Sequence, residues 1–293
     1  MRTWKRFVPP ILYVSPTVLM LVVLMLIPIG LVIWYSFQSN VITEANPEFV
    51  GLAHYREILQ DPTFHASLSN TAVFVVGSVI AHLVLGLLFA ILLNTDLLPR
   101  WLIGIFRALF ILPWLLTGAI VAVLWRLILH PHGIFNYLFQ SIGVLDVSKE
   151  WLSDPKLALL SVTLIQIWRG YPFFMISLLA GLQGISPVLY EAASIDGASA
   201  FRRFWSITLP QLKPIIISMA LLDLIWTSHE FTIIWMTTGG GPLGKTEMLS
   251  TYTYKFAFEK YLFSTSSAAA VITLVVSAVL AYAYVRHQRN MAS

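Results

Sequence analysis

Among the ionisable side chains that lie within long apolar runs of the sequence, three are candidates for a functional site: Arg169, Asp223 and Glu230. A charge at the centre of a bilayer costs roughly 2.5–3.5 kcal/mol on insertion scales, so such groups usually face protein or water. Arg169 and Asp223 fall at similar depths in two consecutive apolar runs and could form an ion pair between two helices. The sequence alone leaves open whether that pair is structural or faces a ligand.

The residues Asp223, Thr227 and Glu230 are spaced i, i+4 and i+7, so they share one face of a helix. Trp226 lies at the edge of that face. Carboxylates, a hydroxyl group and an indole ring offer hydrogen-bond acceptors and a stacking surface suited to a sugar. The pattern predicts a cavity that contacts a sugar. The alternative is a proton-coupled secondary transporter of a small polar solute, which would use Asp223 and Glu230 as its proton carriers.

Other patterns indicate chemistry less strongly. The stretch 239–246 fits the P-loop pattern letter for letter, but it follows an apolar run rather than a buried strand, so we expect a turn. His130 and His132 are separated by a proline, and no His or carboxylate cluster has metal-ligand spacing. We interpret His229 as a packing residue and place the remaining histidines, His82 among them, in loops or near span ends. The sequence therefore predicts no catalytic residue, no metal site and no enzyme activity in this chain.

The composition indicates a membrane protein. The chain has 293 residues, of which 58% are hydrophobic and 11% charged, whereas soluble domains carry about 25% charged residues. A spanning helix needs about 20 apolar residues. Six stretches qualify, which predicts an all-α polytopic fold with one transmembrane domain over residues 1–293. The predicted spans are 12–37, 70–94, 102–128, 157–181, 213–236 and 264–286.

The distribution of basic residues predicts the orientation. An even number of spans puts both termini on one side, and nine Lys and Arg residues in the loops or at the span ends lie on that side, against six on the other. The bias places both termini in the cytoplasm and accounts for the net charge of +4 without a nucleic-acid partner. On the opposite side, segments 49–69 and 134–143 have apolar residues at helical spacing and predict short surface helices.

The segment 186–210 interrupts the apolar pattern with polar and basic residues. Pro187 suits the first turn of a helix that includes Glu191, and Gly197 permits a backbone turn that other residues resist. We expect a second short helix at 198–206 with exposed aromatic and basic side chains. Such a helix could lie in the membrane interface or dock in a cleft of a soluble partner.

The spacing within this segment resembles the EAA loop of ABC-importer permeases. The matching positions are Glu191-Ala192-Ala193, Gly197 and Ile207-x-Leu209-Pro210, with Pro210 and Pro214 ending the loop before the fifth span. Nearly the whole chain resembles sugar-importer permeases of the maltose and glycerol-3-phosphate uptake type, through the stretches FVGLAHYREIL, FILPW, LAGLQGISPVLYEAASIDGA and TTGGGP. The resemblance implies the type I ABC-importer permease fold, with six transmembrane helices, in a bacterial or archaeal plasma membrane.

The resemblance also implies roles for particular residues. The loop would dock into a cleft of a cytoplasmic ATPase, with Gly197 forming the bend between its two helices. The implied ATPase-coupling residues are Glu191, Ala192, Ala193, Asp196, Gly197, Ile207, Leu209 and Pro210. The implied substrate-binding residues are Asp223, Thr227, Glu230, Trp226, Arg169, Gly170 and Phe173.

By the same resemblance, the chain is a permease subunit that imports a sugar by alternating access. The implied partners are a second homologous permease, two cytoplasmic ATPase subunits and an extracytoplasmic substrate-binding protein, all assembled at the lipid bilayer. No cofactor is expected in this chain, because ATP and Mg²⁺ would bind to the ATPase. The two carboxylates favour a neutral oligosaccharide, disaccharide or polyol as the carbohydrate substrate.

Overall fold

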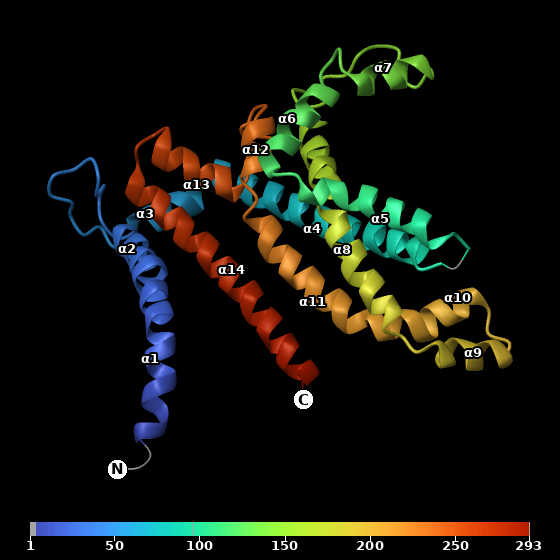
Figure 1. Cartoon of the computed structure of the whole chain (residues 1–293). Coiled ribbons are helices and arrows are strands. Elements are labelled where there is room, and N and C mark those ends of the chain that lie inside the picture. Colours follow the sequence, from blue (N-terminus) through green and yellow to red (C-terminus); the bar gives the residue numbers. More distant parts are fainter. Residues whose placement is uncertain (1–3, 96, 293) are drawn as a thin grey trace. The chain divides into compact units, whose positions relative to one another are not determined.

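The computed structural model describes residues 4–95 and 97–292 (Figure 1). Within these ranges the chain is helical, and its β pairing is limited to an isolated antiparallel bridge between Gln38 and Phe49. Five of the described helices are long and apolar enough to span a membrane, and a strongly bent helix pair brings the number to six. The predicted all-α polytopic class is confirmed. Residues 1–3 of the predicted cytoplasmic N-terminus lie outside the described ranges.

The chain divides into two compact units, Met1–Phe64 with Tyr252–Val275 and His65–Thr251 with Val276–Ser293. The first unit begins with one continuous apolar helix, which consists of α1 (Trp4–Leu21), the π-helical turn η1 (Val22–Leu26) and α2 (Ile27–Tyr35). The π-helical turn precedes a proline, which lacks the amide that a regular helix would use there. In the most apolar part of the span Tyr13–Tyr35, no residue is buried by the rest of the chain. Its side chains are therefore available to lipid or another subunit.

The rest of the first unit consists of α3 (Ala53–Gln60), most of α13 (Leu249–Phe258) and the first part of α14 (Phe263–Ala292). Ile58 on α3 and Tyr252 on α13 are almost fully buried. The ring of Phe64 meets the ring of Tyr252 edge to face, with the centroids 5.8 Å apart. Apolar packing therefore holds the short helices of this unit together.

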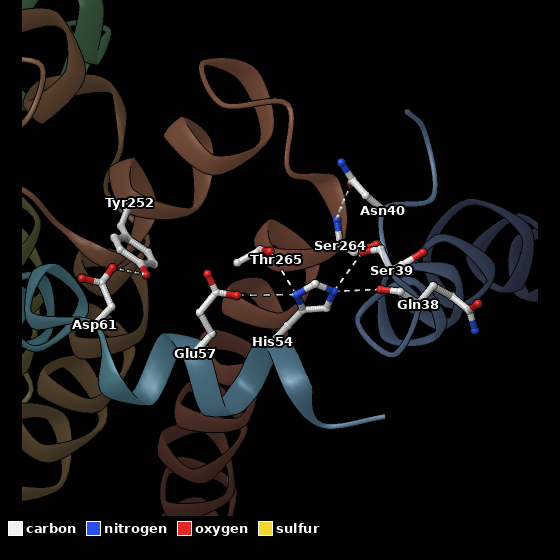
Figure 2. Close-up of polar contacts among 9 residues, drawn as sticks. All are labelled: Gln38, Ser39, Asn40, His54, Glu57, Asp61, Tyr252, Ser264 and Thr265. Carbon is white, nitrogen blue, oxygen red and sulfur yellow. Dashed lines mark hydrogen bonds and ion pairs between the residues drawn. The ribbon is translucent and has the colours of Figure 1, made fainter. Parts of the chain in front are cut away.

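His54 on α3 joins three segments of the first unit (Figure 2). Its Nε2 lies 2.8 Å from the carbonyl oxygen of Gln38 and 2.9 Å from that of Ser39. Because carbonyl oxygens only accept hydrogen bonds, Nε2 carries the hydrogen. On the other side of the ring, Nδ1 lies 3.1 Å from Oγ1 of Thr265 on α14 and 4.0 Å from a carboxylate oxygen of Glu57.

A second polar contact in this unit joins Asp61, which follows α3, to α13 (Figure 2). The hydroxyl of Tyr252 donates to Oδ2 of Asp61 at 2.8 Å, and the amide of Thr63 donates to Oδ1 at 2.8 Å. Burial opposes ionisation of the Asp61 carboxyl, but these hydrogen bonds outweigh it and hold the pKa below its ordinary value of 3.8. Burial, together with the bond to Asp61, raises the pKa of Tyr252.

The second unit holds the remaining helices, with α8 at its centre. The helices are α4 (Pro62–Leu93), α5 (Arg100–Leu115), α6 (Gly118–Ile128), α7 (Ile134–Ser141), α8 (Ala158–Gln183), α9 (Pro187–Ile195), α10 (Ala200–Arg203), the π-helical turn η2 (Phe204–Thr208), α11 (Leu209–Ser228) and α12 (Thr232–Thr237). Phe174, Met175 and Leu178 of α8 are fully buried. At Gly86 on α4 an added Cβ would lie 2.4 Å from the Cβ of Phe174, so glycine permits the close helix crossing.

The predicted third span, 102–128, is not one continuous helix. It consists of α5 and α6, which meet at an angle of 99°. Leu116 and Thr117 are extended, and the hydroxyl of Thr117 accepts a hydrogen bond from the amide of Ile120 at 3.4 Å. Thr117 therefore caps the start of α6 and stops α5 from continuing, although the surrounding residues are apolar throughout.

The predicted fifth span, 213–236, differs at both ends. The helix runs unbroken through α10, η2 and α11, from Ala200 to Ser228, so the predicted short helix at 198–206 is its beginning and the two prolines do not interrupt it. The π-helical turn η2 lies just before Pro210 and accommodates the missing proline amide. The helix then stops at Ser228, and three residues separate it from the start of α12 at Thr232.

The structure confirms short helices in both predicted surface segments, as α3 and α7. The second span begins at Pro62, earlier than predicted, because the polar residues before position 70 continue the same helix. The short helix α13 was not predicted, since its many hydroxyl groups and aromatic rings give it no clear apolar stripe.

The contact between Asp61 and Tyr252 can be tested by Tyr252→Phe. Loss of a hydrogen bond to a charged group should destabilise the folded protein by about 1.5–3 kcal/mol, seen as a lower Tm of the purified protein at neutral pH. Because the pKa of Asp61 is lower in the folded protein than in the unfolded chain, its ionised carboxylate stabilises the fold at pH values above the unfolded-state pKa. This stabilisation is lost as the pH falls through the folded-state pKa. The difference in Tm between wild type and variant should therefore narrow below about pH 4.

Tyr137→Phe is the matched control. This tyrosine on α7 is exposed, and its hydroxyl makes no hydrogen bond with any described residue. Its Tm should equal that of the wild type. Equal Tm values for Tyr252→Phe and wild type would contradict the role assigned to the Asp61 contact.

Candidate functional site

A cavity of about 230 Å³ lies within the second unit, between α5, α8, α11 and the turn that follows α11. All seven predicted substrate-binding residues line it, together with two that were not predicted. The lining residues are Trp114, Gln166, Arg169, Gly170, Phe173, Asp223, Trp226, Thr227 and Glu230. The structure therefore brings the predicted residues together, while their contact with a substrate stays a prediction.

The ion pair that crosses this cavity is not the predicted one. Arg169 pairs with Glu230 instead of Asp223, with Nη1 and Oε2 3.0 Å apart. Glu230 reaches Arg169 because α11 ends at Ser228, so the carboxylate projects from a turn rather than from the helix. Its other oxygen accepts a hydrogen bond from the amide of Ile233 at 3.0 Å. Glu230 thus joins α8 to the first turn of α12.

Asp223 instead pairs with His82 of α4. Nδ1 of His82 lies 2.7 Å from Oδ2 of Asp223, and the hydroxyl of Thr227 donates to Oδ1 at 3.0 Å. The interpretation of His82 as a residue in a loop or near a span end is wrong, since it lies in the middle of α4 and is fully buried. Its position at the centre of the predicted span 70–94, whose other residues are all non-ionisable, was the signal that sequence reasoning missed.

Gly170 contributes space rather than a contact group. A Cβ atom added there would lie 2.3 Å from Cε1 and Nε2 of His82, closer than real side chains approach. The imidazole ring of His82 therefore occupies the volume that any larger residue at position 170 would need. The substrate contact of Gly170 stays a prediction, whereas the structure shows that this glycine makes room for His82.

Aromatic rings form one side of the cavity. Phe173 stacks on Trp114 with the ring centroids 6.0 Å apart and lies 5.4 Å from the ring of Trp226. Trp114 and Trp226 are both about half exposed. Trp114 belongs to the FILPW stretch, but nothing in its spacing indicated a place beside the cavity. Three rings at this position give a surface on which a flat apolar ligand face could stack.

Two residues that line the cavity each have a buried polar atom without a partner within the described residues. Oε1 of Gln166 and Nε of Arg169 are buried and make no hydrogen bond. A buried amide oxygen without a donor and a buried guanidinium nitrogen without an acceptor are each costly. Both atoms belong to residues that line the cavity, but the atoms themselves are buried, so a ligand could reach them only after the side chains move.

The loop 186–210 adopts the predicted arrangement of a helix, a glycine turn and a second helix. Pro187 starts α9, and Glu191 lies exposed on it. Gly197 has a φ of +76°, a left-handed conformation that glycine adopts without strain. Ile195 and Phe201, on either side of the turn, are strongly exposed. The loop therefore presents both carboxylate and apolar groups to a partner.

Two hydrogen bonds hold the loop's two helices against each other. Tyr190 and Thr208 share a bond of 2.9 Å between their hydroxyl groups, and Nη1 of Arg203 donates to the hydroxyl of Ser194 at 2.7 Å. The remaining predicted coupling positions vary in exposure. Ala192, Asp196 and Pro210 are exposed, while Ala193, Ile207 and Leu209 are half-buried.

The P-loop-like stretch 239–246 is a turn that is held by hydrogen bonds of its own residues and of Thr238. It follows helix α12 rather than a strand, and α13 begins only at Leu249. The hydroxyl of Thr246, which would bind Mg²⁺ in a P-loop, is buried and bonds to the carbonyl of Gly241 at 2.6 Å and to Oγ1 of Thr238 at 2.7 Å. The arrangement lacks the strand and the free hydroxyl that nucleotide binding at this stretch requires.

In the part of the chain that the structure describes, His229, His130 and His132 show no arrangement that would bind a metal ion. Nε2 of His229 lies 2.8 Å from the hydroxyl of Ser277 on α14, which agrees with a packing role. The rings of His130 and His132 lie 5.7 Å apart. Across the described ranges, no group of three or more His, Cys, Asp or Glu side chains is placed to hold a metal ion.

Comparison with known proteins gives a family match over most of the chain. Residues 82–292 match the family model described as binding-protein-dependent transport system inner membrane component. The chain is 36% identical to the trehalose/maltose transport system permease protein MalF of Thermococcus litoralis, over 90% of this chain and 88% of the relative. It is 31% identical to the sulfoquinovosyl glycerol transport system permease protein SmoG of Agrobacterium fabrum, over 94% and 89%.

Two solved structures share the fold. A bacterial ABC transporter involved in the import of the acidic polysaccharide alginate has a chain with a TM-score of 0.83 and 23% identity, and the match covers 99% of both chains. A bacterial alginate ABC transporter in complex with an alginate pentasaccharide-bound periplasmic protein gives a TM-score of 0.85 and 22% identity, over 99% of this chain and 98% of that one. The predicted ABC-importer permease fold is confirmed.

The role of Gly170 as the space for His82 predicts the effect of Gly170→Ala. The added methyl group must displace the imidazole ring or separate α4 from α8, at a cost of about 1–3 kcal/mol, which should lower the Tm of the purified protein. Gly104→Ala on α5 is the control, because a Cβ there meets nothing within 4 Å. That substitution should leave the Tm unchanged or raise it, since alanine favours helix by roughly 1 kcal/mol. Similar Tm values for the two variants would contradict the assignment.

Proposed function

The chain belongs to the family of binding-protein-dependent transport system inner membrane components, the permeases of ABC transporters, and on this premise we propose that its cargo is a carbohydrate. The observation that carries the proposal is the cavity, in which three aromatic rings face a set of hydrogen-bonding groups. Relatives named for trehalose, maltose and sulfoquinovosyl glycerol transport support the same class of cargo.

The chemistry of the cavity suits a sugar ring. Sugars combine an apolar face, which stacks on aromatic rings, with a rim of hydroxyl groups that donate and accept hydrogen bonds. Phe173 and Trp226 provide the stacking surface, while the side chains of Gln166, Arg169 and Thr227 bring hydrogen-bonding groups to the cavity lining.

We propose further that both termini lie in the cytoplasm of a bacterial or archaeal cell and that the chain works with a second homologous permease, two ATPases and an external binding protein. The family description names a binding protein, and the fold matches a transporter solved with a periplasmic protein. ATP and Mg²⁺ would bind to the ATPase, so this chain would supply no catalytic group to hydrolysis.

The loop 186–210 is the proposed contact with the ATPase. Its exposed Glu191 and apolar side chains suit a docking cleft, and its second helix continues without a break into α11. The unbroken helix from Ala200 to Ser228 has 29 residues, which corresponds to about 43 Å. It joins the loop to Asp223 and Trp226 in the cavity. Movement of the loop would therefore shift the cavity wall, which is the coupling that alternating access requires.

A proton-coupled secondary transporter is not proposed. Asp223 and Glu230, the two carboxylates that such a transporter would use, are paired with His82 and Arg169 respectively. The family match points to ATP-driven transport instead.

Glu230→Gln tests the cavity as the cargo site. The amide keeps the bond to the α12 amide but removes the counter-charge of Arg169, so transport should fall several-fold while the complex still assembles. The assay is ATP-driven uptake of radiolabelled maltose or trehalose into proteoliposomes that contain all subunits and the binding protein. Glu48→Gln, at an exposed residue of the first unit, should transport normally. Unchanged uptake by Glu230→Gln would remove Glu230 from the cargo path.

Glu191→Gln tests the coupling loop. Loss of the charge should weaken docking to the ATPase, because charge-assisted hydrogen bonds are stronger than neutral ones. Cargo-stimulated ATP hydrolysis by the reconstituted complex should fall several-fold, with normal amounts of permease in the membrane. Glu259→Gln changes an exposed glutamate outside the loop and should have no effect. Full hydrolysis by Glu191→Gln would show that this carboxylate is not a coupling contact.

A further inference from the structure

The contacts of His82 determine where its hydrogens lie. Nε2 lies 3.0 Å from the main-chain carbonyl oxygen of Gln166. A carbonyl oxygen can only accept, so Nε2 carries a hydrogen. In the tautomer without a hydrogen on Nε2, the lone pair of Nε2 would face a lone pair of the Gln166 carbonyl oxygen at 3.0 Å, which is repulsive. The ring has no exposed surface, so no water can relieve such a contact.

The same reasoning applies to the other ring nitrogen. Nδ1 of His82 lies 2.7 Å from Oδ2 of Asp223, a distance that requires one hydrogen between the two atoms. That hydrogen belongs either to an imidazolium facing a carboxylate or to a carboxylic acid facing a neutral imidazole. In both forms the pair has a net charge of zero. A neutral imidazole beside an ionised Asp223 would instead place two lone pairs in contact within a buried site.

The second pair of the cavity is also balanced, since Arg169 meets Glu230 at 3.0 Å. These are the other charged groups that line the cavity, one from α8 and one from the turn after α11. Within the predicted span 70–94, α4 brings no ionisable group besides His82. Two carboxylates therefore face the cavity, yet the cavity has no net charge.

We propose that His82 is a positioning residue that retains one proton for Asp223, keeps the cavity electrically neutral and thereby restricts the cargo to uncharged carbohydrates. The proposal rests on the function proposed above and extends it to the charge class of the substrate. An anionic sugar entering this cavity would leave water without finding a surplus cation, which is unfavourable. His82 contacts the cargo only through Asp223, and Gly170 provides the space in which its ring is held.

A mutant cycle separates this role from simple packing. The variants are His82→Leu, Asp223→Asn and the double variant, each purified as the complete complex. His82→Leu leaves Asp223 without its proton partner and should lower the Tm. Asp223→Asn should keep a Tm close to the wild type, because its amide can donate to a neutral imidazole. The double variant should have a higher Tm than His82→Leu alone, since it has no carboxylate left to neutralise.

The outcome for the double variant decides the role of His82. If histidine only fills space, removing the charge at position 223 cannot restore stability. A double variant no more stable than His82→Leu would therefore overturn the proposal. This measurement uses no sugar, so it stands independently of whether the complex transports a carbohydrate.

The charge class of the cargo is tested by direct binding. The purified complex, without its binding protein, is titrated with maltose and with maltobionate, its singly charged acid. Wild type should bind maltose at least about tenfold more tightly. Glu230→Gln, which leaves Arg169 without its counter-charge, should reduce that preference. Equal affinities in the wild type would overturn the selection for uncharged sugars, whereas failure to bind either sugar, with the mutant cycle as expected, would count against the proposed function and the cargo claim together.

Discussion

The hydrogen bond between His82 and Asp223 links α4 to α11 past α8, and the arrangement of the second unit depends on it. A buried carboxylate between apolar helices is tolerated only when a partner neutralises it. The partner here comes from a different helix, and it fits only because position 170 has no side chain. The pair satisfies Asp223, and Arg169 is left to meet Glu230. The position of the imidazole therefore bears on how both carboxylates of the cavity are paired.

Glu230 connects this polar core to the next part of the fold. One carboxylate oxygen meets Arg169, while the other accepts from the first turn of α12, the helix that leads to the turn at 239–246. At the opposite end of α11, the helix continues through a π-helical turn into the loop 186–210. The cavity thus lies between the loop 186–210, at one end of α11, and α12 with the turn 239–246, at the other.

Local patterns predicted the membrane fold and the shared face of Asp223, Thr227 and Glu230, while the family resemblance supplied Gly170 and Phe173, and Trp114 and Gln166 were not predicted. Apolar length indicates spans, and helical spacing indicates which residues share a face. The pairing of Arg169 could not be read in this way, since spacing does not reveal where a helix ends or which neighbour it meets. Likewise, the cap at Thr117 breaks the third span inside an apolar run, where hydropathy carries no signal. His82 lies at the middle of the predicted span 70–94, but its partner Asp223 lies 141 residues further along the chain.

The close fit between Gly170 and His82 restricts the order in which these positions can change during evolution. A larger residue at 170 meets the imidazole ring at once, whereas a smaller residue at 82 leaves the glycine unaffected and opens space beside it. Divergence at this pair must therefore begin at position 82, and a lineage that has since enlarged position 170 cannot regain the histidine in one step. The imidazole ring thus sets the upper limit on the size of the residue at position 170.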